Sequence, residues 1–415
     1  MRVLALALGV PFPPLGGGLT RTFHLLKALA ARHEVELLAF TYGETHGEAP
    51  FSVRVVPVPW VWSADYEQMS SADTTVARKA AERLTYQVDD PWFVSSLDPV
   101  LMTDAVQAAL RARPDLVLFE GTPLAQFAAC LPRGLPRVLD LFDLHSVMAR
   151  RALDGATAEP RAALAREAAR TLAFERRAAR VSHACLVVSP DDAVAAGDVL
   201  GALRVHVVPN GVDTAYFTPS TDPPEPGAIL FTGRMSYEPN ADAVCHFARD
   251  VLPLVRREAP HARLHIVGVA PPPRVVALQS DAVIVHGRVD DVRPYHRRAE
   301  VVVVPVRAGG GTRLKVLEAA ASGKSIVSTR LGVEGLPFHD GRDVLVADTA
   351  PDFAAAVVSS LRDGDRREEL GRQAREVACS YDWSAIGASL CDIVEQVVSH
   401  RDGIHEERCA HESLR

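Results

Sequence analysis

The segment best suited to chemistry is a run of three glycines followed by two cations. It reads GGGTRLKVLEA at residues 309–319 and follows the very apolar stretch 301–304. Glycine frees backbone N–H groups at the start of a helix, where those groups and the helix dipole favour a phosphate. Arg313 and Lys315 add two positive charges in the first turn, where the dipole disfavours them. Because a bound anion would resolve that conflict, the segment predicts a phosphate site.

Lys315 and Glu318 lie one helical turn apart, so both side chains point along one face. In a binding site the ammonium would reach a diphosphate, and the carboxylate would accept hydrogen bonds from sugar hydroxyls. The alternative is an i, i+3 ion pair on a solvated helix. Three glycines and two misplaced cations favour the ligand-binding interpretation.

Two further loops suit the same chemistry. Gly16 to Gly18 separate the first apolar run from a helix, where backbone amides can approach an anion; a tight turn without a ligand is the alternative. Gly233 and Arg234 follow the apolar run 228–232, at the kind of strand end where open α/β sheets bind ligands. An arginine there grips phosphate bidentately, and an exposed turn arginine is the alternative.

Polar groups also end two apolar runs of the first half. Glu120 follows 116–119, and Asp143 and His145 follow 137–141. His145 lies two residues after Asp143, so a carboxylate or the backbone can orient its ring as base, acid or hydrogen-bond donor. One such group alone is most simply a cap or a solvated loop residue. Their recurrence at successive strand ends favours a functional role.

The elements that must position these groups are short apolar runs that alternate with amphipathic helical stretches. This alternation is typical of α/β domains whose parallel strands are buried on both faces. So many strands rarely share one open sheet, so two sheets are expected. The predicted strands span 3–8, 34–40, 53–58, 116–119, 137–141, 185–188, 205–208, 228–232, 263–267, 282–286, 301–305, 325–328 and 344–346.

The chain divides best at residues 218–227, where four prolines in ten residues exclude a helix or a central strand. This linker separates residues 1–217 from 228–380, and each part has a normal domain size. Two α/β domains joined in this way are expected to enclose a cleft. A helix at 381–400 is expected to return to the first domain, and 401–415 to form a solvated tail.

Composition excludes several classes of function. The 415 residues are 48% hydrophobic and 23% charged, as in soluble globular proteins. A net charge of -7 leaves no broad basic surface for nucleic acid. Six scattered cysteines without a CxxC pair indicate a reducing compartment, so a cytoplasmic location is expected. No run is long enough to cross a bilayer, which leaves peripheral association, at the inner face of the membrane, as the expected form of membrane contact.

No pattern predicts a metal site. Asp363 and Asp365 have DxD spacing but lie in a turn between late helices, where N-capping explains them. His405, Cys409 and His411 fit no common zinc pattern.

The motifs resemble those of a known family. VPNGVD at 208–213, FTGR at 231–234, GRVDDV at 287–292 and GGGTRLKVLEA at 309–319 occur in the order typical of GT-B glycosyltransferases of family four, also called glycosyl transferases group one. The resemblance implies an α/β fold of two Rossmann-like domains whose parallel sheets face a central cleft. The second domain would bind a nucleotide sugar and the first an acceptor, and transfer would retain the anomeric configuration.

The resemblance also implies roles for individual residues. Arg234 and Lys315 would hold the diphosphate, and Glu318 the donor ribose. His145 would act near the reacting sugar, as a catalytic group together with Arg234 and Lys315. The other implied donor-binding residues are Gly17, Gly18, Arg288, Val289, Gly310, Gly311, Thr312 and Arg313, and the acceptor-binding residues are Glu120, Asp143 and His145.

Two positions depart from the family pattern. The family often has a second glutamate eight positions before the one matched by Glu318, but this chain has Gly310 there. Backbone N–H groups are expected to contact the donor sugar instead. The family often has a lysine six residues after the arginine, where this chain has Asn240. Arg313 or Lys315 is expected to supply that charge.

The expected function is transfer of a sugar from a UDP- or GDP-linked donor to a sugar, a lipid-linked or a small-molecule acceptor. Such a reaction would serve bacterial polysaccharide, glycolipid or natural-product glycoside biosynthesis. Cations and helix N-terminal amides would stabilise the departing diphosphate, so no metal or cofactor is expected. Two alternatives are a nucleotide-sugar epimerase of the same fold and an inactive nucleotide-sugar-binding protein.

Overall fold

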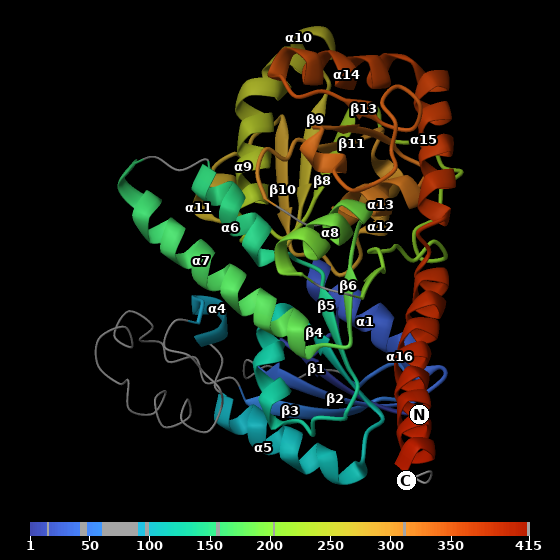
Figure 1. Cartoon of the computed structure of the whole chain (residues 1–415). Coiled ribbons are helices and arrows are strands. Elements are labelled where there is room, and N and C mark those ends of the chain that lie inside the picture. The colour runs from blue at the N-terminus through green and yellow to red at the C-terminus, as the bar shows by residue number, and fades with distance from the viewer. Residues whose placement is uncertain are drawn as a thin grey trace. The chain divides into compact units, whose positions relative to one another are not determined.

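The computed structural model describes residues 1–14, 16–41, 48–59, 90–95, 99–154, 158–201, 204–309 and 313–412. The chain forms two compact units, Met1–Pro209 with Gly387–Arg415, and Asn210–Ile386 (Figure 1). Residues 210–217, assigned above to the first domain, belong to the second unit. The reason is a long-range pairing, since Val212 forms a parallel bridge with Asp382 and the Thr214 amide donates to the Asp382 carboxylate.

The first unit is built on a parallel sheet. Its strands in the described residues are β1 (Arg2–Ala7), β2 (Glu34–Thr41), β3 (Arg54–Pro59), β4 (Leu116–Glu120), β5 (Arg137–Leu141), β6 (Ala184–Val187) and β7 (Val205–Val207). They lie in the order β3-β2-β1-β4-β5-β6-β7, and every neighbouring pair is parallel. β4 and β5 are buried along their whole length, as expected for a sheet with helices on both faces.

Helices of the first unit follow the strands. They are α1 (Gly17–Ala30), α4 (Trp92–Ser95), α5 (Pro99–Ala109), α6 (His145–Asp154), α7 (Ala158–Val181) and α8 (Pro190–Ala195), with short turns η1 (Leu110–Ala112), η2 (Thr122–Cys130) and η3 (Ala196–Leu200). α6 and α7 pack side by side as a helical hairpin (Figure 1). No helix in the described parts of the chain is long and apolar enough to cross a membrane.

The last helix, α16 (Trp383–Glu412), begins in the second unit and joins the first unit from Gly387 onward. There it lies beside α1, where the Cys391 thiol approaches the Ala28 carbonyl oxygen at 3.6 Å and Arg32 pairs with Asp392 at 3.0 Å. The expectation of a separate tail at 401–415 is wrong for residues up to 412. The segment from Arg401 is rich in helix formers and Gly403 is its one helix-breaking residue, so the helix continues.

The second unit contains the other parallel sheet. Its strands in the described residues are β8 (Ala228–Thr232), β9 (Arg263–Val267), β10 (Val283–Gly287), β11 (Val301–Val304), β12 (Ser325–Ser328) and β13 (Leu345–Val346). They lie in the order β10-β9-β8-β11-β12-β13, again all parallel. The expected pair of parallel sheets is confirmed.

Helices also surround the second sheet (Figure 1). They are α9 (Glu238–His246), α10 (Leu252–Glu258), α11 (Pro273–Val276), α12 (Arg293–Arg298), α13 (Leu314–Ala321), α14 (Ala350–Arg362) and α15 (Gly364–Cys379), with short turns η4 (Phe247–Val251) and η5 (Leu331–Val333).

Each sheet has one switch point, where the order in which successive strands are added reverses from one side of the first strand to the other. In the first sheet β2 and β3 extend to one side of β1, and β4 starts on the other. In the second sheet β9 and β10 extend to one side of β8, and β11 starts on the other. Loops beyond the carboxyl ends of strands at such a point form the usual ligand site of open α/β sheets. The loops at 16–18, 233–234 and 309–313 all follow strands at these points.

Candidate functional site

The second unit brings Arg234 and Lys315 to the same switch point, from the loops after β8 and β11. Gly233 turns the chain at the end of β8 with a φ of 153°, and its N–H donates to the Val267 carbonyl oxygen at 3.0 Å. Arg234 follows with an exposed side chain, and its carbonyl oxygen accepts from Asn240 Nδ2 at 2.9 Å. An exposed arginine at a strand end suits a bidentate contact with phosphate.

Lys315 is buried, with 9% of its surface exposed, because its neighbours in α13 pack into the core. Its Nζ donates to Asn240 Oδ1 at 2.7 Å and lies 4.0 Å from the centroid of the Phe231 ring. Burial lowers its pKa to about 7, with a further lowering from the charge of Arg313 and an opposing effect of Glu318. The ammonium is therefore held in place but poorly solvated.

Glu318 lies on the same helix, and burial raises its pKa to about 7, while the positive charge of Lys315 lowers it. Within the described residues, no ion pair joins Glu318 to Lys315, whose ammonium is bonded to Asn240 instead. The solvated i, i+3 pair considered above therefore does not form.

The glycine-rich loop itself is described up to Gly309, which has a φ of 100°. Gly310, Gly311 and Thr312, predicted to bind the donor, lie outside the described residues. A Cβ on Gly309 would sit 2.8 Å from the Tyr237 hydroxyl, so this phenol lies against the loop. Tyr237 is 40% exposed, and sequence reasoning missed it. An aromatic residue three positions after Arg234, at the N-terminus of α9, was the available signal.

The remaining predicted donor residues differ in exposure. Arg313 precedes α13 and is 8% exposed, whereas Arg288 follows β10 and is exposed. Val289 packs against the hydrophobic core of the second unit. Of these two predicted donor-binding residues after β10, Val289 is the one that packs against the core.

An aromatic and charged cluster, missed by sequence reasoning, joins Tyr216 to the segment that follows β10. The Arg293 guanidinium stacks 4.0 Å from the centroid of the Tyr216 ring and pairs with Asp291 at 2.8 Å. The Tyr216 hydroxyl donates to Asp291 Oδ1 at 3.3 Å. Burial raises the pKa of Tyr216, and the charges of Asp291 and Glu318 raise it further.

In the first unit, Glu120 is buried rather than presented to a ligand. Its side chain is 1% exposed and accepts from the Thr22 hydroxyl at 3.2 Å. Next to it, the Arg21 guanidinium binds both oxygens of Asp140, at 2.7 and 2.8 Å. Burial and the negative charge of Asp140 raise the pKa of Glu120 to about 8, so this carboxyl group holds its proton at neutral pH. It presents almost no surface to an acceptor.

His145 opens α6 with a ring that is oriented by the backbone. Its Nδ1 lies 3.1 Å from the Asp143 carbonyl oxygen. Because a carbonyl oxygen can only accept, Nδ1 carries the proton in the neutral ring, and Nε2 is left as an acceptor. The ring packs 4.6 Å from the Phe93 ring, and its side chain is 29% exposed. Of the two kinds of orienting group considered above, the backbone of Asp143 makes the hydrogen bond, and a carboxylate oxygen of Glu175 lies 3.8 Å from the same nitrogen.

Glu175 on α7 holds the start of α6, which sequence reasoning missed. Its two oxygens accept from the backbone N–H groups of His145 at 2.8 Å and Ser146 at 3.1 Å. The carboxylate is fully buried, and burial raises its pKa while the two N–H groups and His145 lower it. A cap supplied by another helix leaves no local sequence signal.

Gly17 and Gly18 form the first turn of α1, after Gly16 with a φ of 90°. A Cβ on Gly18 would touch the Phe142 ring at 3.6 Å, so the turn packs closely against the loop after β5.

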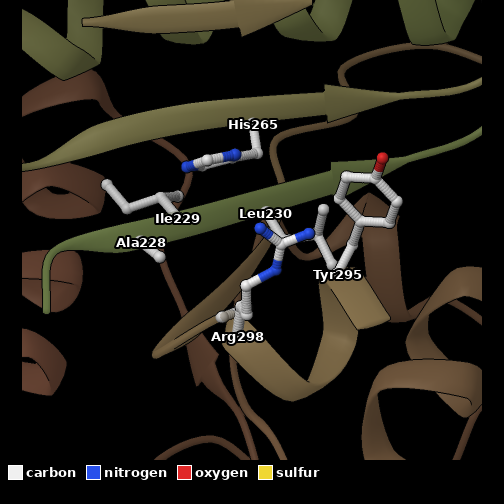
Figure 2. A pocket seen from close by; sticks show the side chains of 7 residues that line it. Ala228, Ile229, Leu230, His265, Tyr295 and Arg298 are labelled. Carbon is white, nitrogen blue, oxygen red and sulfur yellow. The ribbon is translucent and has the colours of Figure 1, made fainter. Parts of the chain in front are cut away.

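The described residues include no group of three metal-ligating side chains. A small cavity of about 10 Å³ lies between β8, β9 and α12, lined by His265, Tyr295 and Arg298 (Figure 2). It has room for about one water molecule. Because it adjoins Ala228, at the amino end of β8, it is separate from the switch point.

Two family models match this chain, one over each half. Residues 15–216 match the family model described as Glycosyltransferase Family 4, and residues 226–363 match Glycosyl transferases group 1. A D-inositol 3-phosphate glycosyltransferase of Catenulispora acidiphila is 29% identical over 236 residues, 50% of this chain and 54% of that protein. The chain thus matches about half the length of such curated relatives.

Two solved structures share the fold over nearly the whole chain. Sucrose-phosphate synthase from Thermosynechococcus elongatus aligns with a TM-score of 0.71 at 18% identity, covering 96% of this chain and 100% of that one. Anabaena HepE in complex with UDP and glucose aligns with a TM-score of 0.65 at 14% identity, covering 95% and 99%.

Proposed function

The chain belongs to the family four glycosyltransferases, the glycosyl transferases of group 1, and from this premise we propose that it transfers a sugar from a nucleoside-diphosphate donor to an acceptor hydroxyl. The observation that carries the proposal is a buried lysine ammonium, bonded to a neutral amide, beside an exposed arginine at the switch point of the second sheet. Two cations at that point suit a diphosphate, which carries negative charge and many acceptor oxygens.

Donor recognition in this proposal uses the second unit. Arg234 and Lys315 bind the diphosphate, and the Glu318 carboxylate accepts hydrogen bonds from the ribose hydroxyls. The Anabaena structure with UDP and glucose supports a nucleotide-sugar donor by fold similarity. UDP and GDP are the donor nucleotides that we propose to test first.

Acceptor recognition uses the first unit. With Nδ1 bonded to the Asp143 carbonyl, His145 keeps Nε2 as an acceptor for a sugar hydroxyl. Because Glu120 is buried and protonated, we give it a structural role beside Arg21 and Asp140. The proposed acceptor class is taken from relatives that are named as D-inositol 3-phosphate glycosyltransferases. The first acceptors to test are therefore phosphorylated polyols and the sugar acceptors of bacterial glycolipid or glycoside synthesis.

The reaction breaks the bond between the anomeric carbon and the β-phosphate oxygen, whose electron pair stays on the phosphate. The acceptor oxygen bonds to the anomeric carbon on the face from which the phosphate departs, so that the configuration is retained, and its proton passes to the departing phosphate. Arg234, Lys315 and helix N-terminal amides neutralise the charge that develops on the diphosphate. Each well-placed donor of this kind contributes ~2 to 4 kcal/mol to transition-state stabilisation. The proposal requires no protein nucleophile and no metal.

The test begins with thermal shifts for UDP, GDP, ADP and TDP, followed by nucleotide release from the matching sugar donors with candidate acceptors. Lys315→Met should raise the KM for the donor and lower kcat/KM by about 10- to 100-fold, since it removes one charge-assisted bond. Lys324→Met is the matched control, because Lys324 is also a lysine whose pKa is lowered by burial, to about 8, but it lies at the amino end of β12. Equal effects of the two substitutions would refute the assignment of Lys315.

A further inference from the structure

Two side chains from different helices converge on the space beside Gly233. A Cβ on this glycine would lie 2.8 Å from Lys315 Nζ and 2.9 Å from Asn240 Nδ2. Lys315 comes from α13 and Asn240 from α9, and the ammonium donates to Asn240 Oδ1 at 2.7 Å. The absence of a side chain at position 233 therefore makes room for an ammonium and an amide at the carboxyl end of β8.

The amide of Asn240 has one orientation that satisfies both of its ends. Its Nδ2 donates to the Arg234 carbonyl oxygen at 2.9 Å, so Oδ1 is the atom turned towards Lys315. Asn240 is 9% exposed, and its backbone N–H is bonded to the Tyr237 carbonyl oxygen at 2.9 Å, which fixes it in the first turn of α9. The side chain is thus a rigid acceptor for the ammonium.

The charge of the ammonium is not neutralised by this arrangement. On one side it faces the ring of Phe231 and on the other the neutral amide of Asn240. Within the described residues no carboxylate forms an ion pair with it, and the nearby Arg313 disfavours its charged form. An external anion is the partner that would complete the site.

We propose that Asn240 is a positioning residue for the donor diphosphate: it holds the ammonium of Lys315 at the carboxyl end of β8, in the space left open by Gly233. This inference rests on the proposed function. Asn240 acts through Lys315, and what matters is the position of the cation rather than the helix that carries it. A lysine at position 240 should therefore replace the one at position 315.

The test is a relocation of the cation, measured by calorimetry with UDP and GDP. Lys315→Leu should weaken binding of the preferred nucleotide by about 10- to 100-fold, the loss expected for one charge-assisted bond. Adding Asn240→Lys should restore the affinity to within about threefold of the wild type. The matched control adds Glu238→Lys instead, which changes the net charge by more but places the ammonium on the exposed start of the same helix.

The outcomes separate cleanly. The inference is overturned if nucleotide affinity recovers both with Asn240→Lys and with Glu238→Lys. It is also overturned if affinity recovers with neither substitution while both double variants are folded. If the Asn240→Lys double variant does not fold, Asn240→Ala decides: it should weaken UDP or GDP by about 3- to 10-fold and leave the nucleoside monophosphate unchanged. Equal losses of affinity for the nucleoside diphosphate and the monophosphate, or no loss of affinity for the diphosphate, overturn the inference. A folded wild type that binds no nucleoside diphosphate refutes the proposed function itself.

Discussion

Lys315 occupies a position that folding alone would give to an apolar residue. Its neighbours Val316 and Leu317 are fully buried, and a lysine among them incurs a desolvation cost that one amide and one aromatic ring only partly offset. Residues whose burial opposes their charge are concentrated at functional sites. The spacing of Lys315 and Glu318 singled them out in the sequence. Asn240, which contacts Lys315, comes from another helix, and the sequence marked it only as a position where the family often has a lysine.

Donor affinity should depend on pH in two directions. The pKa of Lys315 is lowered to about 7, so the ammonium that we propose for diphosphate binding is lost as the pH rises through 7. The pKa of Glu318 is raised to about 7, so the carboxylate that we propose for ribose binding is lost as the pH falls through 7. Affinity for UDP or GDP is therefore expected to be greatest near pH 7 and to fall on each side by at most about tenfold per pH unit.

Calorimetric titrations between pH 5.5 and 9, with the nucleotide's own phosphate ionisation subtracted, check this expectation. Lys315→Met should abolish the fall at high pH, and Glu318→Gln should abolish the fall at low pH. A wild-type profile that is flat over this range would contradict both assignments.

At the scale of elements, the strands were the most predictable features of the chain. Every strand in the described residues lies within one residue of its predicted bounds, because strands buried on both faces appear as short, continuous apolar runs. The end of α16 was missed, since no proline or glycine cluster marks it. The carboxylate that caps α6 comes from α7, and the amino-acid sequence carries no signal for such a long-range cap.

Glu175→Ala should uncouple the first turn of α6 from α7. Two buried N–H groups lose their acceptor, which should cost about 1 to 3 kcal/mol in the free energy of unfolding. His145 then loses its fixed position, so kcat should fall while the affinity for UDP or GDP, which we propose to bind in the second unit, stays unchanged. Glu175→Gln keeps one amide oxygen and should recover part of both losses.

Thermal denaturation and steady-state kinetics check the two effects separately. Arg176→Ala is a suitable control, because this neighbouring residue is exposed and bonds the Val199 carbonyl oxygen instead of α6. A Glu175→Ala variant that loses stability but keeps kcat would limit Glu175 to folding.

For the whole molecule, the sequence predicted two α/β units but not where one ends. The proline-rich stretch 218–227 is the conspicuous break in pattern, yet the second unit begins at Asn210, because Val212 and Thr214 pair with Asp382 far along the chain. Such pairings depend on tertiary contacts. The chain crosses between the units at 209–210 and again at 386–387, so α16 contributes to both.

Leu390→Ala tests how much the first unit depends on that returning helix. The Leu390 side chain is fully buried in α16, so its truncation should reduce the free energy of unfolding by about 2 to 5 kcal/mol. Affinity for UDP or GDP should not change, since the proposed donor residues belong to the second unit. Denaturant melts followed together with nucleotide titrations measure both quantities, and a variant with wild-type stability would contradict the expected contribution of α16.

The small space at Gly233 has a consequence for how this protein and its relatives diverge. If the ammonium can come from either helix, positions 240 and 315 evolve together. A homologue that has lysine at 240 no longer needs it at 315, whereas glycine is needed at 233 in both cases. Aligned homologues should therefore show the two positions changing in concert on an invariant glycine, and independent drift at 240 and 315 would mean that the two side chains do not share a task.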